Sequence, residues 1–298
     1  MYEKALMLIN GNAGPSFIQK NIELTAGILT NHIEELIIRK THYKGHAEEV
    51  LQSTGKEYDL IIIMGGDGTV HECVNGLAAL NDPPSVCILP GGTCNDFSRT
   101  LAVPQNIKRA ADSLMNGTTR HVDIGTMNER FFTNFYGIGL IAQTSENING
   151  DWKNKLGKVS YLLSALQTFT NPDPFSFELT LDDETMTDEA VMVLVVNGNF
   201  IGASQLPFQG IVPDDGLFNV FVVSQGGASL LREYLTAKNP FAWDPEPTDV
   251  KHYKARHVAL STPEPMKADT DGEIYMKTPA VIENLPARIP FLVPDTPQ

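Results

Sequence analysis

The sequence has few cysteines and no long apolar run. Its 298 residues include three cysteines, Cys73, Cys87 and Cys94, and no CxxC pair. They predict neither a zinc cluster nor a disulfide framework, and they favour a reducing compartment. The longest apolar runs, 60–64 and 191–196, fall far short of the roughly 20 residues that cross a bilayer. The N-terminus lacks the pattern of a signal peptide. We therefore expect a cytoplasmic protein whose membrane contact is peripheral and transient.

Basic residues are also scarce relative to acidic ones. The 22 Lys and Arg against 36 Asp and Glu give a formal net charge of −14. This charge repels nucleic-acid phosphate, and no basic stripe with interleaved aromatics is present, so nucleic acid is not an expected partner. A surface that faces anionic lipid would need a local cationic patch, although short lysine runs more often mark solvated faces. The two candidate clusters are Lys153, Lys155 and Lys158, and Lys251, Lys254 and Arg256.

The length and the hydrophobic patterning predict two domains. Up to about residue 123, short apolar runs alternate with helical patterns, which is typical of βαβ units. The run at 60–64 lacks polar alternation, as expected of a parallel strand covered on both faces. Later segments such as 175–181 and 217–223 alternate and predict antiparallel strands. Helical patterns at 158–169 and 228–238 and a proline-rich loop at 240–247 interrupt them.

The predicted fold is therefore an α/β N-terminal domain followed by a β-rich, sandwich-like domain. We place the first domain at residues 1–128 and expect the tail, 284–298, to rejoin it. The β-rich domain then covers residues 129–283. Ligands of an open α/β sheet bind at the carboxyl ends of its strands, so the turns that follow the predicted strands of the first domain carry the functional interpretation.

The strongest motif is GGDGT, which comprises Gly65, Gly66, Asp67, Gly68 and Thr69 and directly follows a predicted buried strand. Glycines at a strand-to-helix turn let backbone N–H groups approach phosphate closely, and a helix N-terminus favours negative charge. Phosphate would repel an aspartate here unless a cation lay between them, so Asp67 indicates Mg²⁺. The alternative is a tight turn with Asp67 as the N-cap. The motif is neither a Walker A loop nor GxGxxG.

A second glycine turn, PGGTCNDFSR, spans 90–99 and again follows a predicted strand. Alone it could be a glycine turn and a helix cap. Together, the two blocks resemble the diacylglycerol, sphingosine and ceramide kinase superfamily, which has a G-T-x-N-D-x-[AS]-R signature, and its soluble bacterial diacylglycerol kinase-like branch is most similar. The resemblance implies an NAD kinase/diacylglycerol kinase-like fold and an ATP-dependent lipid kinase of lipid metabolism, phospholipid biosynthesis in particular. It assigns Gly92, Thr93 and Asn95 to the nucleotide, and Arg99 to the phosphates or to bracing the loop.

The N-terminal turn NGNAG, which begins at Asn10, stands where this superfamily has its N-P-x-[SA]-G phosphate loop. Gly11 replaces the proline, and we expect this change to leave the turn flexible. Asn10 and Gly14 are therefore either phosphate-binding residues or parts of a plain turn. Thr41 lies in the next connection, where the family often has a threonine that contacts the nucleotide. His46 follows it and is more typical of an ordinary loop residue.

A PDDGL segment in the β-rich domain contains Asp215 and Leu217. It resembles the family's D-D-G-x-[LF], whose aspartate and a nearby carbonyl hold a divalent ion. The same letters are typical of a turn into a hairpin, and the approach at 209–213 is several residues shorter than the family's spacer. The metal residues that the resemblance implies are Asp67, Asp215 and Leu217, and at the PDDGL segment both interpretations stay open.

Asp271 and Glu273 lie in a DGE tripeptide that matches the family's V-D-G-E. Alone it would usually be a turn, but its place after the other blocks favours function. A lipid hydroxyl is too weak an acid to attack phosphorus unaided, so a carboxylate must take its proton. The resemblance implies Glu273 as this base and Asp271 as its partner. We expect a cleft in which Asp67 holds Mg-ATP, with an apolar pocket of the second domain for the acyl chains.

Two other functions compete with the lipid kinase. NAD kinases and other soluble-substrate kinases share the GGDG turn, but a GSTAY-like segment is absent. A catalytically silent nucleotide or lipid sensor would explain the altered turn at Asn10 and the short approach to the PDDGL segment, whereas Asp67 and Glu273 argue against it. The sequence leaves open the lipid, the pathway and the oligomeric state, for which a homodimer is one alternative. Weaker matches to the family lie at 132–134, 156–161 and 196–198, and at Gly137 and Gly139.

Overall fold

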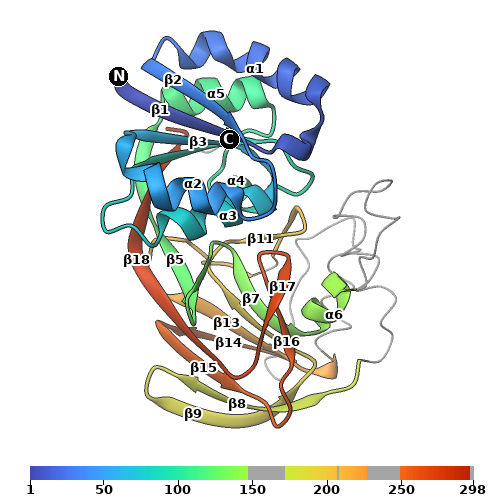
Figure 1. Ribbon diagram of the computed structural model, residues 1–298. Coiled ribbons are helices and arrows are strands. Elements are labelled where there is room, and N and C mark those ends of the chain that lie inside the picture. The colour runs from blue at the N-terminus through green and yellow to red at the C-terminus, as the bar shows by residue number, and fades with distance from the viewer. Residues whose placement is uncertain (147–171, 207, 227–248, 296–298) are drawn as a thin grey trace. The chain divides into compact units, whose positions relative to one another are not determined.

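The computed structural model describes residues 1–146, 172–206, 208–226 and 249–295 (Figure 1). The predicted helices at 158–169 and 228–238, the proline-rich loop at 240–247 and the family match at 156–161 lie outside the described residues. Within the described part of the chain, no helix has an apolar stretch of the length that a membrane crossing requires.

The chain forms two compact units. Unit 1 comprises Met1–Ile124 and Ala287–Gln298, and unit 2 comprises Gly125–Pro286. The predicted boundaries differ from these by a few residues, because strands β5 (Thr118–Met127) and β18 (Ala280–Val293) each run from one unit into the other. In β18 the boundary falls between Pro286 and Ala287, whose φ is 50°.

Unit 1 is built on a parallel sheet with the strand order β2-β1-β3-β4. The end of β18 adds a parallel neighbour to β4, where Phe291 pairs with Val86. All six residues of β3 are buried, which agrees with its continuous apolar sequence. The strands are β1 (Tyr2–Ile9), β2 (Ile33–Lys40), β3 (Leu60–Gly65) and β4 (Ser85–Pro90).

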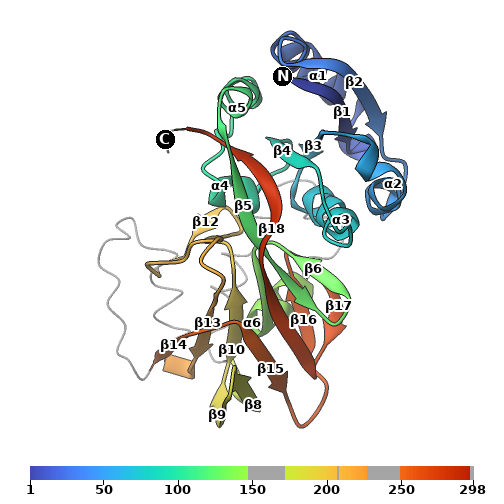
Figure 2. The same cartoon turned by 90° about the vertical axis from the view of Figure 1, so that its left-hand side faces the viewer.

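Helices cover both faces of this sheet. Helices α1 and α5 pack together on one face, and α2 and α3 pack together on the other (Figures 1 and 2). The chain turns to one side after β1 and to the other after β3, so the turns that follow these neighbouring strands lie at the switch point where open α/β sheets bind ligands. The helices are α1 (Pro15–Leu29), α2 (His46–Thr54), α3 (Asp67–Leu77), α4 (Asp96–Thr100) and α5 (Ile107–Met115), with 3-10 turns η1 (Gly11–Ala13) and η2 (Gly55–Glu57).

Unit 2 contains a six-stranded antiparallel sheet with the order β14-β13-β10-β7-β16-β17. Its other strands continue the ten-stranded sheet beyond β18 in the order β18-β15-β8-β9, in which neighbouring strands are antiparallel. Strand β5 also pairs with the short β6, and β11 and β12 form a separate pair. Helix α6 (Leu140–Glu146) follows β7. The bounds are β6 (Arg130–Phe132), β7 (Phe135–Gly139), β8 (Phe175–Leu181), β9 (Glu184–Ala190), β10 (Met192–Val196), β11 (Phe200–Ile201), β12 (Ser204–Gln205), β13 (Phe218–Val223), β14 (Val250–Ala255), β15 (His257–Ser261), β16 (Lys267–Thr270) and β17 (Glu273–Lys277).

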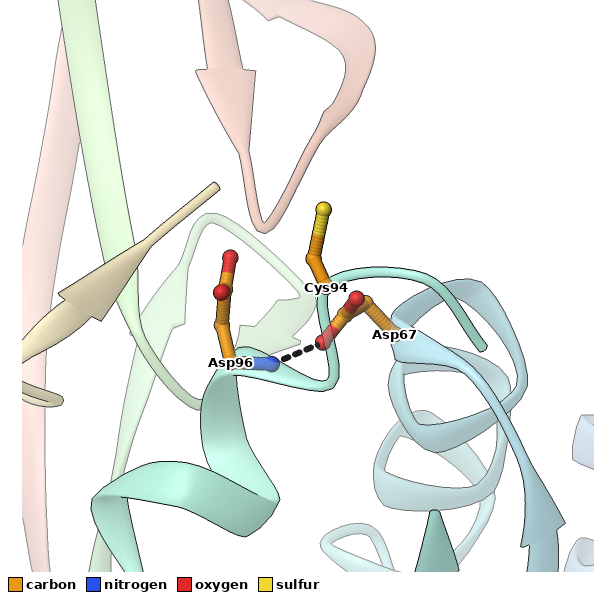
Figure 3. Close-up of side chains that lie close together, drawn as sticks. All are labelled: Asp67, Cys94 and Asp96. Carbon is orange, nitrogen blue, oxygen red and sulfur yellow. Dashed lines mark hydrogen bonds between the residues drawn. The ribbon is translucent and has the colours of Figure 1, made fainter. Parts of the chain in front are cut away.

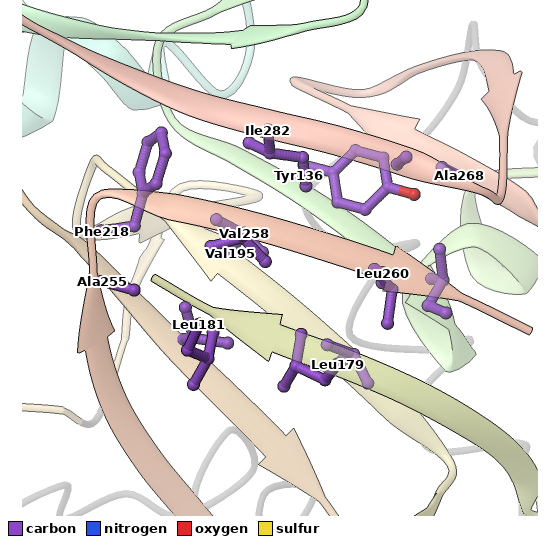
Figure 4. Packing of buried hydrophobic residues seen from close by; sticks show 14 of the residues in the cluster. Tyr136, Leu179, Leu181, Val195, Phe218, Ala255, Val258, Leu260, Ala268 and Ile282 are labelled. Carbon is purple, nitrogen blue, oxygen red and sulfur yellow. The ribbon is translucent and has the colours of Figure 1, made fainter. Parts of the chain in front are cut away.

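The inner faces of these two sheets form one core (Figure 4). In β8, Leu179 and Leu181 point into this core while Glu178 is exposed, which is the period of two expected for a half-buried strand. Strand β10 differs, because Val193 and Val195 join this core and the alternate Leu194 joins a second cluster on the opposite face. Burial on both faces explains why β10 is continuously apolar in sequence.

Candidate active site

Two glycine turns of unit 1 contact each other at the carboxyl ends of β3 and β4. The N–H of Gly91 donates a hydrogen bond to the carbonyl of Gly65 at 2.8 Å. A Cβ atom at Gly92 would lie 2.5 Å from the Cα of Gly66, and one at Gly66 would lie 2.9 Å from the Cα of Gly92. These distances are too short for any side chain, so the contact requires glycine at both positions. The GGDGT and GGTCND motifs therefore form one backbone-lined surface.

Asp67 joins these two turns. It is the first residue of α3, and Gly66 takes the N-cap position. The Asp67 carboxylate accepts hydrogen bonds from the N–H groups of Asn95 (2.9 Å) and Asp96 (2.7 Å), so it caps the start of α4 across the turn (Figure 3). The carboxylates of Asp67 and Asp96 and the thiol of Cys94 each place an atom within 4.8 Å of the others. This cluster concentrates negative charge beside the glycine turns.

Asn95 and Arg99 hold the second turn from within. Asn95 adopts a left-handed conformation and is 9% exposed. Its side chain accepts from the Gly92 N–H at 2.8 Å and donates to the Gly92 carbonyl at 3.1 Å. Arg99 donates from Nε to the carbonyl of Cys94 at 2.8 Å, which is the bracing role among its two predicted roles. Gly92 and Thr93 are the exposed residues of this turn and present its backbone outward.

The N-terminal turn is packed against Thr41. Asn10 caps the short η1 turn by accepting from the Asn12 N–H at 3.0 Å. The N–H of Gly11 donates to Thr41 Oγ1 at 3.4 Å, and a Cβ at Gly11 would lie 2.0 Å from the Thr41 carbonyl oxygen. Proline has no N–H and carries a Cβ, so it could not occupy this position in this arrangement. Gly14 ends the turn at a φ of 84° and precedes α1.

In unit 2, the DGE tripeptide forms the tip of the β16–β17 hairpin. Thr270 pairs with Glu273, so Asp271 and Gly272 are the two turn residues. Their φ angles, 54° and 88°, are both positive, as a type I′ turn requires. Glu273 is the first residue of β17 and is partly exposed. The backbone of this tripeptide therefore forms the turn that was one of its two interpretations. Asp271 lies in the turn itself, whereas Glu273 lies at the start of the following strand.

The Asp271 carboxylate binds a segment far away in sequence. It accepts hydrogen bonds from the N–H (2.8 Å) and hydroxyl (3.0 Å) of Thr133, and from the N–H groups of Asn134 (2.8 Å) and Phe135 (3.1 Å). Asp271 is only 8% exposed. Its charge is thus used to fix the hairpin tip against the start of β7.

The same segment also binds the turn after β10. Asn197 donates from its side chain to the Thr133 carbonyl at 2.8 Å and from its backbone to the Asn134 carbonyl at 2.7 Å. The N–H of Gly198 reaches the same Asn134 carbonyl at 3.0 Å. The weak family matches at 132–134 and 196–198 are therefore one hydrogen-bonded network with the DGE hairpin, a connection that the sequence analysis missed.

The PDDGL segment forms a turn that leads into β13. The Asp215 carboxylate accepts from the Leu217 N–H at 3.1 Å and forms an ion pair with Lys254 Nζ at 2.9 Å. Gly216 has a φ of 75°, and its carbonyl accepts from Arg256 Nε at 3.5 Å. An ammonium group therefore neutralises Asp215 here. A divalent ion at Asp215 and Leu217 stays a prediction.

Both lysines of the second candidate cationic cluster form ion pairs with acidic residues. Lys251 forms an ion pair with Asp188 of β9 at 2.5 Å, while Lys254 pairs with Asp215. The first cluster, at 153–158, lies outside the described residues. A membrane-facing patch therefore stays a prediction.

Comparison with known proteins places the chain in a family. Residues 4–127 match the diacylglycerol kinase catalytic domain, and residues 136–293 match the YegS C-terminal NAD kinase beta sandwich-like domain. A Staphylococcus aureus (strain JH9) protein named "putative lipid kinase" is 32% identical over 296 residues, which cover 98% of this chain and 97% of that protein. The chain belongs to the diacylglycerol kinase family.

Solved structures of this family have the same fold. A structure titled a "putative diacylglycerol kinase" from Bacillus anthracis str. Sterne has a TM-score of 0.89 at 39% identity, and a diacylglycerol kinase from the same strain has a TM-score of 0.81 at 33% identity. Each match covers 98% of this chain and 97% of the other. An NAD kinase from Archaeoglobus fulgidus, crystallised with ATP, shares the fold alone, with a TM-score of 0.52 at 11% identity. The predicted two-domain fold is confirmed, and family membership indicates a kinase.

Membership in a kinase family implies a divalent metal ion, and the carboxylates near the glycine turns of unit 1 suit Mg²⁺. Mg²⁺ is usually held by one or two carboxylates together with substrate phosphates, and Asp67 and Asp96 supply two carboxylates beside the glycine turns. The thiol of Cys94 is a softer ligand that suits other ions better. Asp96 is not among the residues that the family resemblance assigned to the site. Its proximity to Asp67 depends on how the two turns pack, which the spacing of the motifs does not reveal.

Proposed function

We propose that this diacylglycerol kinase family member transfers the γ-phosphate of ATP to a hydroxyl of a diacylglycerol-like lipid. The observation that carries the proposal is the joining of the two glycine turns through Asp67 at the carboxyl ends of β3 and β4. Exposed backbone without side chains, next to the start of a helix, is the arrangement in which proteins bind polyphosphate.

The nucleotide would bind unit 1. The residues proposed for its phosphates are those of the two joined turns and of the packed N-terminal turn, with Thr41 beside the latter. Asn95 and Arg99 would act by fixing the shape of the second turn, because their side chains bind its backbone. The proposed residues are Asn10, Gly14, Thr41, Gly65, Gly66, Asp67, Gly68, Thr69, Gly92, Thr93, Asn95 and Arg99.

Asp67 and Asp96 would hold Mg²⁺ against the phosphates. When bound there, the ion would neutralise charge on the transferring phosphoryl group and on the leaving ADP. Asp215, with the carbonyl of Leu217, is proposed as a second cation-binding position, at which Lys254 already supplies a positive charge.

Glu273 is proposed as the general base. As the lipid oxygen forms its bond to the γ-phosphorus, the hydroxyl proton passes to the Glu273 carboxylate, and the bond from that phosphorus to the bridging oxygen of ADP breaks. Asp271 is proposed as a positioning residue, since both of its carboxylate oxygens accept hydrogen bonds from the 133–135 segment. The partly exposed Glu273, two residues further, is better placed to meet a substrate.

The test is the transfer of label from γ-labelled ATP with Mg²⁺ to a total lipid extract and to a panel of diacylglycerol, ceramide, sphingosine and phosphatidylglycerol. We expect label in an organic-phase lipid. Label in NAD or a sugar phosphate would show a soluble-substrate kinase instead. If ATP binds but no acceptor of the panel is labelled, the chain is a nucleotide sensor and the proposal is wrong.

A further inference from the structure

Three aromatic rings stack in the loop between β2 and α2. The His46 ring stacks on Tyr43 with 4.7 Å between ring centroids and on His42 with 5.2 Å, and the interplanar angles are 20° and 26°. Tyr43 is 52% exposed and His42 is also exposed. Ordering side chains costs conformational entropy, so other contacts are needed to offset this cost in an exposed stack.

Such contacts are present at both ends of this stack. The Tyr43 hydroxyl donates to the carboxylate of Glu49, in the first turn of α2, at 2.6 Å. The N–H of His42 donates to Nδ1 of His46 at 3.1 Å. Gly45, with a φ of 90°, turns the chain so that α2 begins at His46. The rings are therefore held in place while a large part of the Tyr43 surface faces solvent.

The stack lies on the ligand-binding edge of unit 1. It directly follows Thr41, which contacts Gly11 in the N-terminal turn. Strand β1 separates β2 from β3 in the sheet, so the end of β2 is two strand spacings, about 10 Å, from the GGDGT turn. An extended nucleoside triphosphate spans a comparable length from its terminal phosphate to its base. Phosphates bound at the glycine turns would thus leave the base near the rings.

We propose that the stack formed by His42, Tyr43 and His46 is the platform on which the base of the nucleotide stacks. This inference rests on the nucleotide site of the proposed function and adds to it the position at which the base binds. Stacking on aromatic rings is tolerant of base identity because every base has a π face. The Tyr43 hydroxyl is engaged by Glu49 and does not read base edges. Adenine and guanine nucleotides should therefore bind with similar affinity.

The experiment compares Tyr43→Ala with Tyr43→Phe, which keeps the ring and loses only the bond to Glu49. Calorimetry measures the affinity of each protein for Mg-ATP, Mg-GTP and magnesium tripolyphosphate, which has no base. Tyr43→Ala should weaken ATP and GTP binding by about 5- to 150-fold, the range expected for one lost stacking contact. Tyr43→Phe keeps the ring but loses one of the contacts that hold it, so it should lose less affinity than Tyr43→Ala, and tripolyphosphate affinity should be unchanged in all three proteins.

Unchanged ATP affinity in Tyr43→Ala would overturn the platform, as would an equal loss of ATP and tripolyphosphate binding, which would show a disturbed loop. A parent protein that binds no nucleotide would overturn both this inference and the proposed function. If ATP affinity depends on Tyr43 but no lipid is phosphorylated, the platform stands and the lipid kinase proposal fails.

Discussion

The carboxylate of Asp67 has a structural role and a proposed metal-binding role. Its carboxylate stabilises the start of α4 through the N–H groups of Asn95 and Asp96, and it lies among the atoms that suit a magnesium ion. The N-cap alternative to a catalytic role was partly right, since Asp67 does cap a helix. That helix is α4 of the next turn rather than its own α3, so the capping and the proposed metal role depend on the same contact between turns.

Asp67→Asn should lower Mg-ATP affinity and phosphoryl transfer while the fold is retained. The amide has the size of the carboxylate but no charge, and its NH₂ group cannot accept the second N–H bond, so we expect a loss of about 1–3 kcal/mol in unfolding free energy. Calorimetry with Mg-ATP and thermal denaturation measure the two effects separately. Equal activity in variant and parent, both folded, would leave Asp67 as a helix cap only.

His252 gives unit 2 a dependence on pH. Its ring stacks on Phe221 with 4.5 Å between ring centroids, and its Nε2 lies 2.9 Å from the side-chain oxygen Oδ1 of Asn219. Burial, and secondarily the charge of Lys254, lower the pKa of His252 below its usual value of 6.5. The unfolded chain therefore takes up this proton at a higher pH than the folded chain, and stability is lost as the pH falls below about 6.5.

The denaturation midpoint of the parent should therefore fall more steeply between pH 8 and pH 5.5 than that of His252→Gln, which cannot titrate. Comparison of the two proteins removes the contribution of the other ionisable groups that they share. Parallel pH profiles for the two proteins would show that His252 has the same pKa in the folded and the unfolded chain.

At the scale of elements, the buried carboxylate of Asp271 fixes the tip of the β16–β17 hairpin to the 133–135 segment. Asp271→Asn should reduce the unfolding free energy by about 2–4 kcal/mol, because one oxygen can no longer accept and the remaining donors lose a charged partner. Thr133→Val is the matched control, since it removes only the hydroxyl bond and should cost about 1 kcal/mol. Denaturant titration of both variants measures the difference. A smaller effect for Asp271→Asn than for Thr133→Val would contradict the anchoring role.

Elements with a clear hydrophobic period could be predicted from the sequence. The alternating segment at 175–181 coincides with β8, and the apolar run at 60–64 lies within β3. Strand β9 was missed, because it is an edge strand whose exposed acidic residues lack that period and protect the edge from pairing. Strand β18 contains Pro286 and Pro290, which argue against a strand in sequence.

The site was predictable where its residues are neighbours in sequence. The glycine turns follow buried strands, so their place at the sheet edge follows from the pattern alone. The bonds from Asp271 to the 133–135 segment connect residues 136 to 138 positions apart, and no local spacing encodes them. The contact of Gly66 with Gly92 likewise depends on the pairing of β3 with β4. Motif order predicted which segments matter, and packing decides what each side chain does.

For the whole molecule, the residues proposed for the reaction belong to both units. The nucleotide-binding residues belong to unit 1, whereas Glu273 and its anchored hairpin belong to unit 2. If Glu273 is the base, its removal should affect chemistry and leave nucleotide binding intact. Binding and turnover are therefore separable by one substitution in unit 2.

The most direct measurement is ATP affinity by calorimetry and lipid phosphorylation by label transfer on one preparation of Glu273→Gln, with the exposed Glu178→Gln of β8 as the control. We expect the control to match the parent, and Glu273→Gln to bind Mg-ATP normally while its turnover falls by roughly 10²- to 10⁴-fold, the loss typical of a missing general base. Loss of ATP binding in Glu273→Gln, or turnover equal to that of the parent, would contradict Glu273 as the base that activates the lipid hydroxyl.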